Sequence, residues 1–143
     1  MSQNSKVSVD YSKINDKYYR YKRPLIVTRY DKSNKTYLEN IDEICDSIFR
    51  DKKLFYIYLK ITLNTQVNGK KNWISGKVVN SVMENHINTF VNNYVLCFSC
   101  SNPETELKKK KSKGYLYLKC KACGKRTLLQ NNKVSEKILK LNI

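Results

Sequence analysis

Apolar and polar residues alternate along the first half of the chain in a way that predicts short strands and helices. Residues 25–30 are β-branched and apolar, residues 31–35 are turn-forming, and residues 36–38 return to an extended pattern. Two extended runs joined by a short polar turn predict a β-hairpin. Asn40 then precedes a helical pattern of apolar positions, with Glu43 three residues later, which predicts a helix that begins with a capping box.

The middle of the chain is more apolar. Residues 54–63 are apolar almost throughout, and periodicity alone is compatible with either a buried strand or a buried helix. Residues 67–69 suit a turn, and residues 73–78 suit a return strand in which Trp73 is a packing residue. In residues 79–94 apolar side chains recur every three or four positions, which predicts an amphipathic helix that leads directly into the next segment.

Four cysteines follow this helix as two CxxC pairs, Cys97 with Cys100 and Cys120 with Cys123. This spacing is typical of a zinc ribbon, in which two tight turns aim four sulfurs at one tetrahedral ion and a hairpin links the turns. We expect one structural Zn²⁺, because four thiolates leave no open coordination position. Two disulfides are the alternative, but they would leave Cys45 over, and no signal peptide is expected at the N-terminus. Cys45 fits a small core residue, because it lies on the apolar stripe of the first helix.

Composition and charge narrow the classes of function. The 143 residues carry a formal net charge of +16, with 28 Lys and Arg against 12 Asp and Glu. Residues 97–143 alone contain 12 of these cations and 3 of the acids. Positive charge at this density indicates a polyanion such as nucleic acid, with an acidic protein surface as the alternative. No apolar stretch reaches the length of about eighteen residues that a membrane span needs, so we expect no membrane partner.

The basic residues of the predicted ribbon are the candidate nucleic-acid-binding site. A run of lysines falls where the hairpin should turn, and residues 115–118 alternate as a strand with two tyrosines. Exposed cations beside strand tyrosines suit RNA phosphates and bases, whereas a solvated loop is the alternative for the lysine run. The candidate residues are Lys108, Lys109, Lys110, Lys111, Lys113, Lys119, Lys121, Lys125 and Arg126.

A second basic segment lies near the N-terminus. Residues 18–24 interleave three tyrosines with three cations before a proline. Such a segment can pair with a phosphate-rich partner, and an edge segment whose tyrosines cover the core fits equally well. Residues 1–17 are polar and aperiodic, which predicts a flexible arm. With one histidine and no glycine-rich phosphate loop, the sequence does not predict a self-sufficient active site.

Taken together, several motifs resemble one known domain. The domain is shared by the N-terminal part of eukaryotic translation initiation factor five and the C-terminal part of the initiation factor two beta subunit, and the resemblance covers residues 8–140. The matching motifs are Tyr19-Arg20-Tyr21-Lys22 before a proline, Lys35-Thr36, Asn40, Tyr94-Val95-Leu96-Cys97, Cys100-Ser101-Asn102-Pro103-Glu104-Thr105 and Cys120-Lys121-Ala122-Cys123-Gly124.

Within this family, the YRYK sequence resembles factor five more than the beta subunit. We expect the chain to lack both the long gamma-binding region that precedes the domain in the beta subunit and the helical-repeat domain that follows it in factor five.

The resemblance implies an α+β fold. A small mixed α/β domain with packed helices, residues 18–95, is expected after the arm of residues 1–17. A four-cysteine zinc ribbon with a C-terminal tail, residues 96–143, is expected to follow. The resemblance also implies that residues 54–63 form a helix.

The resemblance further implies a translation initiation factor that activates GTP hydrolysis by initiation factor two and takes part in start-codon selection. Arg20 matches the family's functional arginine, which would act in trans on the gamma GTPase subunit. Lys35 matches a supporting lysine. A further family lysine falls on Ile57, so that Lys53 or Lys60 would have to replace it.

The implied partners are the gamma GTPase subunit of initiation factor two, the small ribosomal subunit and initiator tRNA, with RNA contacts. We expect a monomer in the cytoplasm, or in the host cytoplasm if the gene is viral, that is an accessory factor and not itself an enzyme. Two alternatives differ in function. One is a beta-subunit-like binding module or competitor without an activating role. The other is a general nucleic-acid-binding zinc-ribbon protein, which would bind free nucleic acid in a salt-sensitive way.

Overall fold

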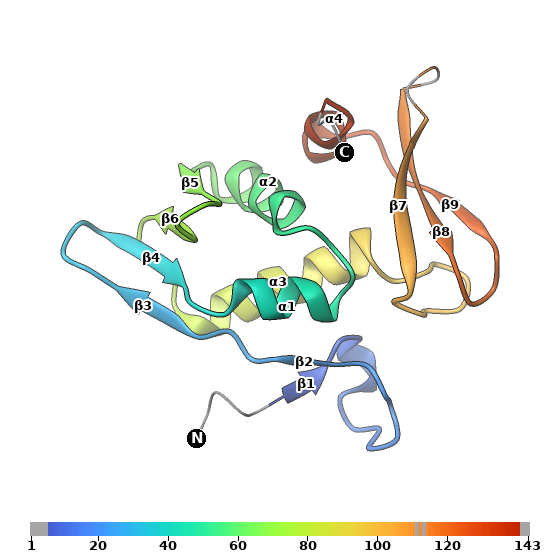
Figure 1. Cartoon of the computed structure of the whole chain (residues 1–143), viewed down its shortest axis with the longest axis horizontal. Coiled ribbons are helices and arrows are strands. Elements are labelled where there is room, and N and C mark those ends of the chain that lie inside the picture. The colour runs from blue at the N-terminus through green and yellow to red at the C-terminus, as the bar shows by residue number, and fades with distance from the viewer. Residues whose placement is uncertain (1–5, 111, 113, 141–143) are drawn as a thin grey trace.

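The computed structural model describes residues 6–110, 112 and 114–140 and confirms the predicted α+β fold (Figure 1). Its strands form three antiparallel sheets, in the orders β1-β2, β3-β4-β6-β5 and β7-β8-β9. The elements are β1 (Lys6–Ser8), a short 3-10 helix η2 (Tyr11–Lys13), β2 (Lys22–Pro24), β3 (Thr28–Tyr30), β4 (Lys35–Leu38), α1 (Ile41–Ser47), α2 (Lys52–Leu63), β5 (Val67–Asn68), β6 (Trp73–Ser75), α3 (Asn80–Tyr94), β7 (Thr105–Lys110), β8 (Tyr115–Cys120), β9 (Arg126–Leu128) and α4 (Lys133–Leu139).

The core of the α/β domain lies between the four-stranded sheet and helices α1, α2 and α3. In the sheet, Leu38 of β4 and Ile74 of β6 are fully buried, because alternate residues of a strand face opposite sides. Phe55 of α2 packs edge-to-face against Phe90 of α3, with ring centroids 5.3 Å apart. The apolar segment 54–63 lies within α2, so it is a helix, as the family resemblance implied. The amphipathic helix predicted for residues 79–94 is α3.

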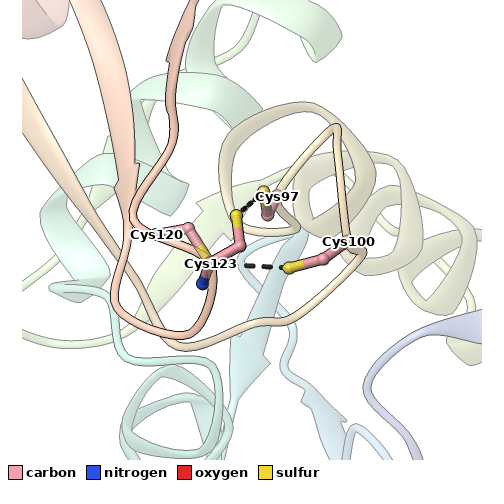
Figure 2. A group of neighbouring side chains, drawn as sticks. All are labelled: Cys97, Cys100, Cys120 and Cys123. Atoms are coloured by element: carbon pink, nitrogen blue, oxygen red, sulfur yellow. Dashed lines mark hydrogen bonds between the residues drawn. The ribbon is translucent and has the colours of Figure 1, made fainter.

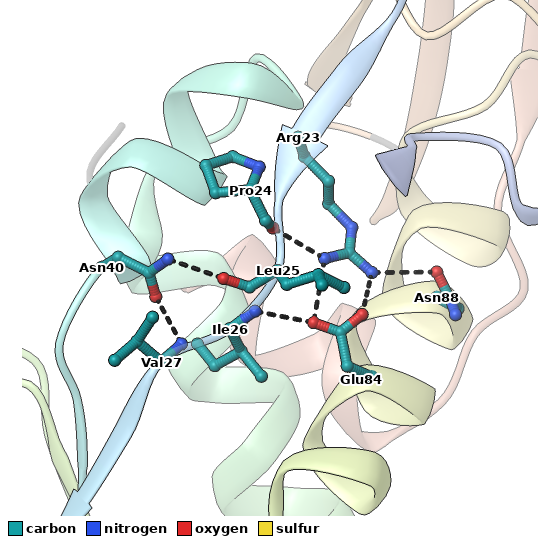
Figure 3. A network of polar contacts seen from close by, with 8 residues as sticks. All are labelled: Arg23, Pro24, Leu25, Ile26, Val27, Asn40, Glu84 and Asn88. Atoms are coloured by element: carbon teal, nitrogen blue, oxygen red, sulfur yellow. Dashed lines mark hydrogen bonds and ion pairs between the residues drawn. The ribbon is translucent and has the colours of Figure 1, made fainter. Parts of the chain in front are cut away.

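Asn40 lies at the N-cap of α1, but the predicted capping box is absent there. The Asn40 side chain makes no cap hydrogen bond. Its amide oxygen instead accepts a hydrogen bond from the Val27 backbone N–H (2.9 Å), and its amide nitrogen donates one to the Leu25 carbonyl (2.8 Å; Figure 3). The side chain therefore satisfies backbone groups between β2 and β3, which have no strand partner there, and fixes the path of the chain.

The segment predicted as a flexible arm contains regular structure from Lys6 onward. Strand β1 pairs with β2, with Val7 opposite Arg23. Val9 is fully buried, and its N–H donates a hydrogen bond to the Tyr21 carbonyl at 2.9 Å. The alternation of Val7 and Val9 spans only three residues, which is shorter than the four to eight that predict a strand, so the sequence pattern did not reveal it.

A buried ion pair attaches β2 to α3 (Figure 3). Arg23 is 0% exposed, and its Nη2 lies 2.7 Å from Glu84 Oε1. The guanidinium also donates to Asn88 Oδ1 at 3.2 Å, while Glu84 Oε2 accepts a hydrogen bond from the Ile26 N–H at 2.7 Å. Because a buried charge is costly without partners, this network fixes β2 and the chain that follows it against α3.

The ribbon contacts the α/β domain at both of its ends. Arg50, which follows α1, donates hydrogen bonds to the carbonyl of Tyr94 at the end of α3 (3.1 and 2.9 Å) and to Thr105 at the start of β7 in the ribbon. At the other end, the segment predicted as a C-terminal tail forms α4, with Val134 and Ile138 buried. Among the described residues, no helix is both long enough and apolar enough to cross a bilayer.

Candidate functional site

The four cysteines of the predicted zinc ribbon converge on one point (Figure 2). Cys97 and Cys100 lie in the turn after α3, and Cys120 and Cys123 lie in the turn that ends β8. Their sulfur atoms all lie within 4.8 Å of one another. Each CxxC turn is closed by a backbone hydrogen bond to the carbonyl of its first cysteine, and in the second turn the donor is Gly124, whose φ of +75° suits glycine.

This arrangement fits one tetrahedral metal ion. Cys97 Sγ lies 3.6 Å from Cys123 Sγ, and Cys100 Sγ lies 3.6 Å from Cys120 Sγ. With metal–sulfur bonds of about 2.3 Å, a regular tetrahedron has sulfur–sulfur edges of about 3.8 Å. The four residues are therefore close enough, and of the right chemistry, to hold an ion in a closed site.

Backbone N–H groups also donate hydrogen bonds to two of the cysteine sulfurs. The Ser99 N–H donates to Cys97 Sγ, and the Cys123 N–H donates to Cys120 Sγ, both at 3.4 Å. Burial raises the pKa of the Cys97 thiol, but hydrogen bonds from the N–H groups of Cys100 and Ser99 outweigh it and lower the pKa to about 7. These hydrogen bonds thus favour, at Cys97, the thiolate form that binds metal.

Arg20 precedes Tyr21, whose hydroxyl contacts the segment that follows the first cysteine turn. The Arg20 side chain is exposed, and its Cζ lies 5.0 Å from the centroid of the Tyr21 ring. Tyr21 packs edge-to-face on Tyr19 at 5.6 Å. The Tyr21 hydroxyl donates a hydrogen bond to Glu104, which raises the pKa of Tyr21, and accepts one from Asn102 at 3.4 Å. The residue next to Arg20 is therefore bonded to the ribbon, a contact that no local sequence pattern reveals.

Arg20 and Lys35 lie in different parts of the molecule. Lys35 begins β4, at the β3–β4 turn, which lies at the end of the domain away from the ribbon (Figure 1). The loop from η2 to β2, which contains Arg20, lies toward the ribbon. On α2, Ile57 is half-buried and packs against the core, whereas Lys53 and Lys60 are exposed one helical turn before and after it. These candidate residues do not form a single cluster.

The strand register divides the predicted nucleic-acid-binding cations between two faces of the ribbon. Residues paired directly across antiparallel strands share a face, and β8 directs Tyr115 and Tyr117 to the outer one. Leu116 and Leu118 are buried on the other face, and Lys109 is paired opposite Leu116. The cations on the tyrosine face are Lys108, Lys110, Lys119 and Arg126.

The other predicted cations are placed differently. Lys121 and Lys125 are exposed in and after the second cysteine turn. Lys111 and Lys113 lie outside the described residues. On the outer face, the Arg126 Cζ lies 5.3 Å from the centroid of the Tyr117 ring. The outer face thus combines aromatic rings with positive charge, as the alternation of residues 115–118 predicted.

Comparison with known proteins identifies the family. A family profile described as the domain found in initiation factors 2B and 5 matches residues 11–126, which include the Arg20 segment and all four cysteines. The chain belongs to this initiation factor 2B/5 family. The shared-domain resemblance derived from the sequence motifs is thereby confirmed, and the chain is placed among translation initiation factors.

Relatives of both branches of the initiation factor 2B/5 family are similar to the chain. Translation initiation factor 2 subunit beta of Methanocorpusculum labreanum is 31% identical over 111 residues, which cover 76% of this chain and 53% of the relative. Eukaryotic translation initiation factor 5 of Saccharomyces cerevisiae is 34% identical over 133 residues, 87% of this chain and 33% of the relative.

A third relative is covered more fully. Translation initiation factor 2 subunit beta of Methanosphaera stadtmanae is 28% identical over 125 residues, 85% of this chain and 87% of the relative. The chain therefore spans about half of one beta subunit, most of another and a third of the yeast factor 5. These identities do not separate the two branches of the family.

Proposed function

We propose that this member of the initiation factor 2B/5 family acts at the small-subunit preinitiation complex as a factor-5-like activator of GTP hydrolysis by initiation factor 2, with a role in start-codon selection. Arg20 is the residue that we assign to the chemistry. It would reach in trans to the gamma GTPase subunit and stabilise the negative charge that develops on the transferred phosphoryl group. The protein would be an accessory factor that supplies one side chain.

The observation that best supports this proposal is the setting of Arg20. Among residues 6–110, 112 and 114–140, no carboxylate forms an ion pair with its guanidinium. Its neighbour Tyr21 is bonded to Glu104 of the ribbon. Such an arginine is suited to insertion beside a phosphate. Its guanidinium has no carboxylate among the described residues to leave before it pairs with the phosphate, and the hydrogen bond of Tyr21 holds the backbone next to it in place.

Single-turnover GTP hydrolysis by initiation factor 2, with initiator tRNA on small ribosomal subunits, tests this proposal. We expect Arg20→Ala to reduce the stimulated rate by about 10³-fold and Arg20→Lys, which lacks the planar fork, to restore little of it. Lys17→Ala is a matched control, because Lys17 is also an exposed cation above a tyrosine ring, 5.3 Å from the Tyr18 centroid. Undiminished stimulation by the Arg20 variants would contradict the proposal.

A beta-subunit-like binding module is the second candidate function, and the structure around Ile57 favours it. Ile57 stands where the family has a functional lysine, and it packs against the core instead of carrying charge to the surface. In the same assay, this function predicts that the chain binds the preinitiation complex and leaves hydrolysis unchanged. If Lys53 or Lys60 replaces the missing lysine, Lys53→Gln or Lys60→Gln should lower the stimulated rate.

We further propose that the cysteine site holds a single structural Zn²⁺, because a closed tetrahedral set of four thiolates is the usual ligand set of structural zinc and leaves no position for substrate. The tyrosine face of the ribbon supports RNA as a partner, through Lys108, Lys110, Lys119 and Arg126. The proposed partners are the gamma subunit, initiator tRNA and the small subunit, and the proposed location is the cytoplasm.

A further inference from the structure

The solvent face of the four-stranded sheet carries a continuous row of side chains, which we call the sheet row. Each member is paired directly with the next across neighbouring antiparallel strands, so their side chains share one face. The intervening residues Thr36 and Ile74 are fully buried on the opposite face. The members of the sheet row are Arg29 on β3, Tyr37 on β4, Trp73 on β6 and Asn68 on β5.

Cations lie on both aromatic rings of the sheet row. The Arg29 Cζ is 4.1 Å from the centroid of the Tyr37 ring, and the Lys35 Nζ is 4.2 Å from the centroid of the Trp73 ring. Both distances are well within the range of about 6 Å for cation–π contacts. The Arg29 side chain is 54% exposed, so its guanidinium is itself available as a stacking surface. Trp73, predicted as a packing residue, is thus part of a half-exposed cationic and aromatic surface.

Positive charge surrounds the sheet row at both ends. Lys32 lies in the β3–β4 turn, and Lys70 and Lys71 lie in the β5–β6 turn; all three are exposed. Of the nearby acids, Glu39 is already paired with Arg29 at 2.7 Å. Asp31 accepts hydrogen bonds from Ser33 in its own turn and from the Tyr37 hydroxyl, and the second of these raises the pKa of Tyr37. The five cations on and around the sheet row outnumber these two acids, so the surface keeps a net positive charge where a phosphate backbone would cross the sheet.

We propose that the sheet row binds single-stranded RNA. Bases would stack on Trp73, on Tyr37 or on the guanidinium of Arg29, and phosphates would contact Lys35 and the turn lysines. An acidic protein surface would use the cations, but Asp and Glu side chains have no aromatic ring that could stack on Trp73 or Tyr37, so the aromatic members favour RNA. Lys35 then contacts RNA at a distance from Arg20, and the inference does not depend on the role of Arg20 in GTP hydrolysis.

Trp73 is the only tryptophan of the chain and reports directly on this surface. The full-length, metal-loaded protein is titrated with a polyuridylate oligomer of about twelve nucleotides, within the usual range of single-strand site sizes. Trp73 emission and the anisotropy of the labelled oligomer are followed together. We expect saturable quenching of Trp73 with the same midpoint as the anisotropy change, and an affinity that falls as salt rises.

Three variants and two controls locate the binding. Tyr37→Leu, Arg29→Gln and Lys35→Gln are each expected to weaken binding by about tenfold. Tyr11→Leu and Lys137→Gln remove an exposed tyrosine and an exposed cation elsewhere and should bind as the wild type does. Far-UV circular dichroism verifies the fold, and Arg29→Gln provides a test at a surface position if Tyr37→Leu fails to fold.

Three outcomes would overturn the proposal. One is the absence of RNA binding at low salt. Another is RNA binding that leaves Trp73 emission unchanged and is equally tight in the sheet-row variants. That result would show that RNA binds a different surface, such as the ribbon. The third is equal quenching by polyglutamate, which would assign the sheet row to an acidic protein.

Discussion

Arg50 donates two hydrogen bonds to Thr105, from Nη2 to Oγ1 over 2.6 Å and from Nη1 to the carbonyl oxygen over 2.8 Å. Together with its bonds to the carbonyl of Tyr94, they connect the end of α1, the end of α3 and the first strand of the ribbon. Arg50 is only 7% exposed, and burial lowers its pKa to about 10. Its hydrogen-bond partners are a hydroxyl and backbone carbonyls, so the guanidinium acts as a set of directed donors.

Arg50→Lys is expected to lower the free energy of unfolding by about 2–4 kcal/mol, because an ammonium cannot reproduce the planar fork and leaves buried acceptors without donors. Urea unfolding followed by circular dichroism measures the loss. Arg29→Gln is the control, since Arg29 is 54% exposed in its ion pair with Glu39 and should cost less than about 1 kcal/mol. Similar losses in the two variants would show that Arg50 does not hold the ribbon.

Tyr21→Phe tests whether the ribbon positions Arg20. The variant keeps the ring beneath Arg20 but removes the hydroxyl that donates to Glu104, so the backbone around Arg20 should open more often. We expect faster amide hydrogen exchange in residues 19–22 and a stimulated GTP hydrolysis rate about tenfold lower.

Tyr11→Phe makes the same chemical change at a tyrosine that is 56% exposed and should alter neither quantity. If exchange increases in Tyr21→Phe while hydrolysis stays at the wild-type rate, then the contact is structural and does not position Arg20 for chemistry.

Glu84→Gln should destabilise the protein more than most single substitutions. It leaves the fully buried guanidinium of Arg23 without a charge partner, which costs about 3–5 kcal/mol. Thermal and urea unfolding measure the effect. Glu106→Gln removes an acid that is 49% exposed and 3.9 Å from Lys108, and it is expected to change stability by less than about 1 kcal/mol.

Thiol reactivity separates the metal ligands from Cys45. Burial raises the pKa of Cys45 to about 12, so at pH 8 it is protonated and inert, because the thiolate is the reactive form. The metal-loaded protein should react slowly at all five cysteines. After chelation, the four ligands should react quickly and Cys45 should still react slowly. Fast reaction of all five would show that the α/β core opens when the metal leaves.

Much of the fold was predictable, because periodic segments carry their own signal. The pattern of residues 79–94 predicted α3 to within one residue, and the alternation of residues 115–118 predicted β8. The spacing of the cysteines predicted their convergence. In each case the pattern is local, so a short window of sequence contains the information.

The features that the sequence did not reveal depend on partners far along the chain. In the sequence, Arg23 and Arg50 cannot be distinguished from surface cations. The burial of Arg23 is explained only by its ion pair with Glu84, and that of Arg50 only by the carbonyls of Tyr94 and Thr105. The sequence pattern predicts that the Asn40 amide caps its own helix, because the competing backbone groups of Leu25 and Val27 have no side-chain signature.

The contacts that hold the ribbon in place also set an order for folding. Tyr21 and Glu104 are 83 positions apart in the sequence, and Arg50 and Thr105 are 55 positions apart. Contacts of such separation cost more loop-closure entropy than the ribbon hairpin, which closes between near neighbours, so we expect them to form after it. During synthesis, the segment around Arg20 leaves the ribosome long before the residues that bind it. A truncated product that ends before Glu104 would therefore carry the arginine without its anchor.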